Sequence, residues 1–172
     1  MIVLACEGKS ELDLVNLLLD EGKLCFTRDD LLDHRAHHVR QLNDIAALIQ
    51  ILPMQTELIV YRIGDTQKDE YDLSRFKIRR DSGLLDIRKV CTRPEIEILV
   101  IIGEGQWDDF LKKKSKIKPK QFVKASIKEY SSFSDYLKAK DVDEIVMAIR
   151  EYKRLIKNKP GEMYLADLLM EN

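Results

Sequence analysis

The chain opens with an apolar segment that ends in a charged turn, and residues 2–11 read IVLACEGKSE. Five apolar residues bounded by charge predict a buried strand over Ile2–Cys6. Gly8 has the backbone freedom to form a tight corner or to let a ligand approach the main chain. The apolar residues of Leu12–Leu19 then fall on one helical face. Glu7 is therefore expected at the carboxyl end of a first strand, where open α/β sheets place their ligand crevices.

Other apolar segments predict the rest of a sheet. We expect a short strand over Leu24–Phe26 and longer strands over Glu57–Ile63 and Asp86–Cys91, since these segments are rich in β-branched and aromatic residues. Ile96–Ile102 is the most apolar run in the chain. Its length and β-branching favour a strand, but periodicity alone does not separate a strand from a buried helix.

Helices are predicted between and after these strands. Ser10, with Asp13 three residues later, is expected to cap the first helix. The further helices are expected over 35–52, 71–76, 107–113, 120–128, 133–137, 142–156 and 162–170. Strands alternating with helices predict an α/β fold with a sheet of about four mainly parallel strands flanked by helices. We expect one domain over residues 1–172, with a helical C-terminal portion from about residue 130.

Composition places the chain among globular proteins that work in the cytoplasm. Its 172 residues can bury a substantial core, and no apolar run approaches the roughly 20 residues that span a bilayer. Met1 begins the first strand directly, without the basic region of a secretory signal. Cys6, Cys25 and Cys91 lie in or beside apolar segments and are expected to be buried thiols in a reducing compartment. A net charge of −1 gives no global argument for nucleic acid.

Two short stretches resemble known families. A strand that ends in Glu7-Gly8-Lys9-Ser10-Glu11 and enters a helix resembles the first motif of the Toprim fold. Proteins that share this fold include overcoming-lysogenization-defect nucleases. The stretch 92–99, followed by 121–124, resembles a pattern of RloB-like, Toprim-related proteins that occur beside restriction and abortive-infection systems. The resemblance implies a Toprim-like Rossmannoid domain, a metal-dependent nuclease activity, and a context of prokaryotic defence or a mobile element.

Several acidic residues lie where such a site would need them. Divalent-metal phosphoryl transfer requires carboxylates that converge on one point, because Mg²⁺ prefers oxygen ligands. Glu11, one helical turn after Glu7, is expected to face the same crevice. The candidate catalytic residues are Glu7, Asp65 and Glu97, and the candidate ligands of Mg²⁺ or Mn²⁺ are Glu7, Asp65 and Glu95. Each acid also has an ordinary explanation, as a helix N-terminal residue, a turn residue or a partner of Arg93.

The second acidic motif departs from the Toprim pattern. That pattern has two aspartates separated by one residue, whereas this chain has only Asp65, and Arg62 stands where an acid is expected. Three acids that follow closely in sequence could compensate for the missing second aspartate: Asp69, Glu70 and Asp72. The alternative function is therefore a binding module with a degenerate site, which contacts a partner protein from the same genetic system or nucleic acid.

One strongly basic stretch, residues 112–120, could neutralise several phosphates of DNA or RNA. A solvated loop explains the same charges. Lys124 and Lys9 add positive charge near the expected acidic site. The candidate nucleic-acid-binding residues are Lys9, Lys112, Lys113, Lys114, Lys116, Lys118, Lys120 and Lys124.

Overall fold

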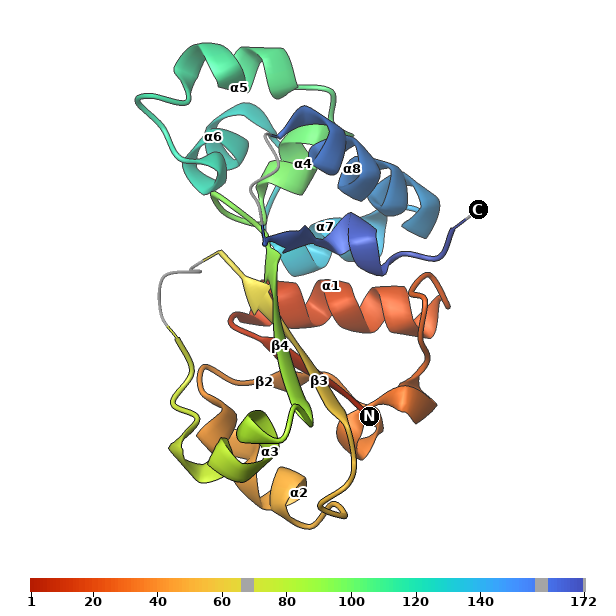
Figure 1. Ribbon diagram of the computed structural model, residues 1–172. Coiled ribbons are helices and arrows are strands. Elements are labelled where there is room, and N and C mark those ends of the chain that lie inside the picture. The colour runs from red at the N-terminus through yellow and green to blue at the C-terminus, as the bar shows by residue number, and fades with distance from the viewer. Residues whose placement is uncertain (66–69, 157–160, 172) are drawn as a thin grey trace.

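The computed structural model describes residues 1–65, 70–156 and 161–171 and shows an α/β protein built on a parallel sheet (Figure 1). The described residues form five strands in the order β2-β1-β3-β4-β5, and every neighbouring pair is parallel. The strands are β1 (Ile2–Cys6), β2 (His37–His38), β3 (Leu58–Gly64), β4 (Leu85–Cys91) and β5 (Met163–Tyr164). With its flanking helices the sheet forms a Rossmann-like arrangement.

The sheet is buried on both faces, which explains the apolar composition of its strands. Successive strand residues point to opposite faces. Leu4 and Cys6 pack in one hydrophobic core, whereas Val3 and Ala5 pack in the other. The helices of the described residues are α1 (Lys9–Asp20), α2 (Ala46–Gln50), α3 (Lys77–Asp81), α4 (Ile98–Gly103), α5 (Trp107–Lys113), α6 (Pro119–Ser126), α7 (Phe133–Ala139) and α8 (Val142–Leu155).

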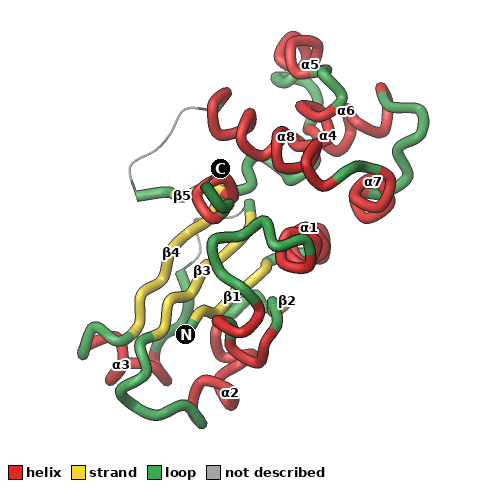
Figure 2. The backbone as a smooth tube through the Cα atoms, turned by 90° about the vertical axis from the view of Figure 1, so that its right-hand side faces the viewer, coloured by secondary structure: helices red, strands yellow, loops and turns green. Residues whose placement is uncertain are grey.

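The helices are distributed unequally along the strands. In Figures 1 and 2, α4 to α8 gather in the upper part of the molecule, and α2 and α3 lie in the lower part. The carboxyl ends of β1, β3 and β4 point toward the upper part. Any site at these strand ends is therefore enclosed by helices from the second half of the chain.

Most of the predicted elements are confirmed. The strands predicted over 2–6, 57–63 and 86–91 are β1, β3 and β4, and the helices predicted over 107–113, 120–128, 133–137 and 142–156 are α5 to α8. Asp141 caps α8 by accepting a hydrogen bond from the Asp143 amide at 2.8 Å. The first helix begins at Lys9, so its N-cap is Gly8, and the predicted cap at Ser10 is wrong.

The second strand was predicted in the wrong place. Leu24 forms only an isolated bridge with Leu169, and the strand beside β1 is β2, where Ala5 pairs with His37. The helix predicted over 35–52 is therefore wrong in its first half, and only Ala46–Gln50 is α-helical, after a 3₁₀ turn. Asp33 and His34 adopt positive φ angles, which turn the chain into β2, and pairing with β1 overrides the helical periodicity.

Four other expectations also require correction. The run favoured as a strand over 96–102 forms α4, which packs against α6 and α8 and is apolar around its circumference because it is enclosed. The helix predicted over 162–170 is β5 followed by a 3₁₀ turn, because residues 163–164 pair with the edge of β4. Cys6 and Cys91 are buried, but Cys25 is exposed. The helix predicted over 71–76 is a 3₁₀ turn at Ser74–Phe76 that leads into α3.

The described helices include none that is both long and apolar enough to span a membrane. The longest, α8, has 14 residues and carries charged side chains at both ends.

A buried arginine on α3 binds the loop that precedes β3, in the lower part of the molecule. Arg79 is 5% exposed, and its guanidinium donates hydrogen bonds to four main-chain carbonyls, at 2.9–3.3 Å. The acceptors are Leu52, Pro53, Met54 and Thr56, in the loop that leads into β3. Arg79 therefore fixes the loop that precedes β3, the strand after which Asp65 follows.

We expect Arg79→Met to lower the free energy of unfolding by about 2–4 kcal/mol, because it leaves these carbonyls without their charged donor. Arg80→Met is the matched control, since Arg80 is exposed and its guanidinium pairs with the neighbouring Asp81. Urea denaturation of the three proteins measures the difference. Equal stabilities for the two variants would contradict the structural role of Arg79.

Candidate functional site

The chain changes direction across the sheet between β1 and β3. It runs from β1 to β2 on one side and then returns to β3 on the other side of β1. Open α/β sheets bind ligands at such a switch point, outside the carboxyl ends of the strands. Glu7 follows β1 and Asp65 follows β3, and the Glu7 amide donates a hydrogen bond to the Ile63 carbonyl at 2.9 Å. The two candidate acids are therefore held at the switch point.

A cleft of about 260 Å³ opens at this point. It is lined by Glu7, Gly8, Ser10, Glu11, Asp65, Glu95, Ile96, Glu97 and Lys120. The structure thus brings together all four acids predicted from the sequence, although they come from three distant segments of the chain. It adds Glu11, which was expected to face this crevice but was not assigned as a ligand.

Two glycines leave room for the carboxylates. A Cβ atom on Gly64 would lie 2.2 Å from Oε2 of Glu7, and a Cβ atom on Gly8 would lie 2.5 Å from Oε2 of Glu11. Both distances are far below van der Waals contact. The absence of side chains at Gly8 and Gly64 therefore determines where the two carboxylates can lie.

Glu11 and Glu97 are the two buried acids of this cleft, at 9% and 6% exposure. Burial raises the pKa of the Glu11 carboxyl, and the nearby carboxylates of Asp65 and Glu7 raise it further. Thr92 partly compensates, since its hydroxyl donates a hydrogen bond to Oε1 of Glu11 at 3.4 Å. Burial and the two nearby carboxylates therefore both favour the protonated form of Glu11.

Glu95 and Glu97 enter the cleft from the turn before α4. Burial also raises the pKa of Glu97, while Lys120 and Lys124 lower it. The ammonium of Lys120 lies 3.8 Å from Oε1 of Glu97, and its main-chain amide donates to Oε2 of Glu95 at 2.9 Å. Burial and the charge of Glu97 raise the pKa of Tyr130 to about 12. Lys120 thus connects α6 to both acids.

The predicted basic residues are divided among different surroundings. Lys9 pairs with Asp13 at 3.4 Å, and Lys112 pairs with Asp109 at 2.8 Å. The Lys113 ammonium lies 5.6 Å from the centre of the Phe122 ring. Only Lys120 lines the acidic cleft among the described lysines.

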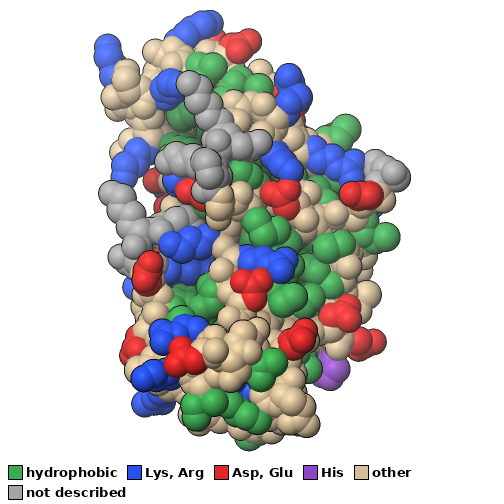
Figure 3. Space-filling model, viewed as in Figure 1, with side chains coloured by type: hydrophobic (Ala, Val, Ile, Leu, Met, Phe, Trp, Pro, Cys, Tyr) green, Lys and Arg blue, Asp and Glu red, His purple; other side chains and the backbone are tan. Residues whose placement is uncertain are grey.

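The remaining basic residues lie near a second cavity or beside the cleft. Lys114, Lys116 and Lys118 line that second cavity. Lys124 is close enough to Glu97 to lower its pKa. In Figure 3, several Lys and Arg side chains project at the upper edge, over α5 and α6 of Figure 1.

Arg62 occupies the core and does not line the cleft. It is 5% exposed, and its guanidinium lies 4.5 Å from the centre of the Tyr71 ring. Of the acids that could have compensated, Asp69 lies outside the described residues. Asp72 accepts hydrogen bonds from the Ser74 amide at 2.9 Å and from Asn43 at 3.1 Å. Asp72 therefore caps a turn, and neither it nor Glu70 lines the cleft.

The cleft suits a divalent cation in its chemistry but is not closed around one. Carboxylate oxygens are the preferred ligands of Mg²⁺ and Mn²⁺, and a cation would offset the repulsion that adds to burial in raising the pKa of Glu11. Within residues 1–65, 70–156 and 161–171, however, no three His, Cys, Asp or Glu side chains stand close enough to hold a metal ion as they are. Side-chain rotation would be needed to bring the ligands together.

Comparison with known proteins adds no family assignment. No protein-family model, curated protein or solved structure matches the chain significantly. The function must therefore be inferred from the residues of the cleft and their surroundings.

The raised pKa of Glu11 predicts how stability depends on pH. In the range between the ordinary glutamate pKa and the raised one, the folded protein binds this proton more tightly than the unfolded chain, so this contribution to stability falls as pH rises. In EDTA, we expect Glu11→Gln to increase the free energy of unfolding at pH 7, and the gain to shrink as pH approaches about 4.

Urea denaturation at both pH values measures this effect. Glu129→Gln, at an exposed position, is the matched control and should change little at either pH. A Glu11→Gln protein that is less stable than the wild type at pH 7 would show that the carboxylate is not strained.

Proposed function

We propose that the protein is a divalent-metal-dependent nuclease, or a related phosphoryl-transfer enzyme, that acts on nucleic acid. The observation that carries the proposal is the convergence of five carboxylates from three segments in one cleft at the β1–β3 switch point. Two of the five, Glu11 and Glu97, are buried, and burial raises the pKa of both, with neighbouring carboxylates raising that of Glu11 further.

The residues of the cleft have distinct roles under this proposal. Glu7, Asp65 and Glu95 would hold Mg²⁺ or Mn²⁺, with Glu11 as a further oxygen ligand. A bound metal would stabilise charge on the phosphate and activate the attacking water. Glu97 keeps its proton to a higher pH than an ordinary glutamate, which suits it for proton transfer. Lys120 and Lys124 would contact phosphate.

The resemblance to Toprim and RloB-like proteins supports the same site. Its first motif supplies Glu7 and Glu11, and its downstream motif supplies Glu97 and Lys124, with Glu95 between the proline and the glutamate of that motif. The cleft contains all four of these acids. Action in the cytoplasm, within a prokaryotic defence system or a mobile element, belongs to the same proposal.

The second candidate is a binding module without catalysis. It is favoured by the open arrangement of the acids, since no three of the described side chains are placed to hold a metal. The single Asp65, with Arg62 committed to the core, points in the same direction. Metal binding distinguishes the two functions.

We expect Mn²⁺ at millimolar concentration to raise the Tm of the wild-type protein, because a ligand that binds only the folded state stabilises it. At a concentration 100 times the Kd the gain is about 2.7 kcal/mol. Glu7→Gln keeps the shape of the side chain and should lose this shift, whereas the exposed control Glu129→Gln should retain it. No shift in the wild type would favour the binding module.

For a competent site, we expect metal-dependent cleavage of DNA or RNA that is abolished by EDTA. Asp65→Asn should slow cleavage by roughly 100-fold, since loss of a ligand or its support weakens metal sites by such factors. Gel electrophoresis of labelled substrates measures the rate. Cleavage that persists in EDTA, or that is unchanged by Asp65→Asn, would exclude the acidic cleft as its source.

A further inference from the structure

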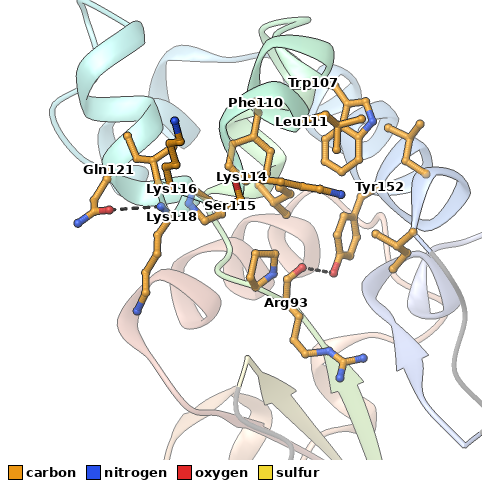
Figure 4. Close-up of a pocket in the computed structure, with 16 residues that line it drawn as sticks. Arg93, Trp107, Phe110, Leu111, Lys114, Ser115, Lys116, Lys118, Gln121 and Tyr152 are labelled. Atoms are coloured by element: carbon orange, nitrogen blue, oxygen red, sulfur yellow. Dashed lines mark hydrogen bonds between the residues drawn. The ribbon is translucent and has the colours of Figure 1, made fainter.

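A second and larger cavity, of about 810 Å³, lies among α5, α6, α8 and the segment after β4 (Figure 4). Its volume is in the range of small-molecule sites. The lining combines aromatic and aliphatic side chains with lysines, and no carboxylate is among the described residues that line it. The proposed function assigns no role to this cavity.

The apolar wall contains three aromatic residues, Trp107, Phe110 and Tyr152. Phe110 packs edge-on against Phe122, with ring centres 5.4 Å apart, and lies 6.2 Å from Trp107. The Tyr152 hydroxyl donates a hydrogen bond to the Arg93 carbonyl, as Figure 4 shows. Neighbouring contacts therefore hold these rings in place before any ligand arrives.

The basic wall comes from the segment that joins α5 to α6. Lys114, Lys116 and Lys118 line the cavity, and in Figure 4 the Lys114 side chain extends across it toward Tyr152. Arg93 also lines the cavity, but its guanidinium pairs with Glu162. The three lysines thus supply the positive charge available to an anionic ligand.

The cavity and the acidic cleft share their dividing wall. Pro94 lines the cavity and the next residue, Glu95, lines the cleft. Lys118 and Gln121 line the cavity, whereas Lys120 between them lines the cleft and its amide binds Glu95 at 2.9 Å. A polymer could therefore occupy both sites at once, with its lysine contacts near the boundary.

We propose that this cavity binds an unpaired nucleobase of a single-stranded nucleic acid whose phosphates contact the lysines of the α5–α6 segment. Aromatic rings beside a basic segment are the combination that binds single strands, because bases stack and phosphates pair with lysine. A duplex does not suit the cavity, since its bases are stacked inside the helix. That the bound nucleic acid continues from this cavity into the acidic cleft rests on the proposed function.

Trp107, the single tryptophan of the chain, reports on this site directly. In EDTA, which prevents metal-dependent cleavage, we expect an oligothymidylate of about ten nucleotides to quench Trp107 fluorescence. An abasic strand of the same length keeps the phosphates but lacks bases. It should bind roughly fivefold more weakly or worse, and leave the fluorescence unchanged. Salt should weaken binding of both strands.

Two pairs of variants test the walls of the cavity by fluorescence anisotropy of a labelled strand. Leu111→Glu places a carboxylate in the apolar wall and should abolish binding, whereas Ile78→Glu, at an exposed position of α3, should not. Lys114→Gln should weaken binding several-fold, whereas Lys77→Gln on α3 removes the same charge and should have little effect. Both control residues lie on α3, in the lower part of Figure 1, whereas α5 and α6 lie in its upper part, and neither residue lines the cavity.

The outcomes separate this inference from the proposed function. Equal binding of intact and abasic strands, or no binding of either, would overturn the base site. If free thymidine monophosphate quenches Trp107 as strongly as the strand does, the ligand of the cavity is a mononucleotide, and the proposal of a single-stranded ligand is overturned. Quenching by the strand together with no Mn²⁺-induced Tm shift would support the base site and reject the metal-dependent nuclease. A Mn²⁺-induced Tm shift without quenching of Trp107 would reject the base site and support metal binding at the acidic cleft.

Discussion

The parallel pairing of β1 with β3 is the constraint on which the candidate site depends. Residues 2–6 pair in register with residues 59–63, so the residues that follow the two strands emerge side by side. Both strands are buried on two faces, and a shift of register would move their apolar side chains out of the two cores. Core packing therefore fixes the position of Glu7 relative to Asp65.

Around Glu7 and Asp65, the fold holds further carboxylates in positions where their charged form is unfavourable. Glu11 is held near two like charges, and Glu97 is buried at the start of α4 with Lys120 as its nearby cation. Glycines at positions 8 and 64 admit the carboxylates instead of excluding them. Such strain is typical of functional sites, where binding of a counter-ion can recover the cost.

The local elements were largely predictable because they depend on short-range patterns. Apolar runs identified β1, β3 and β4, and amphipathic spacing identified α1 and α8. The errors share one cause. Residues 37–38 pair with β1, residues 163–164 pair with β4, and α4 is enclosed by α6 and α8, and no local pattern encodes these partners. The exposure of Cys25 is likewise decided by tertiary packing.

The sequence by itself determined which residues have the chemistry of the site. It placed Glu7 and Asp65 at strand ends and Glu95 and Glu97 around an apolar run, because side-chain type and strand boundaries are local properties. Only the tertiary structure decided that these acids converge with Glu11 on one cleft, and that most of the lysines lie elsewhere. Strand order, helix packing and the conformations at Gly8 and Gly64 bring distant segments together, and these depend on the whole chain folding at once.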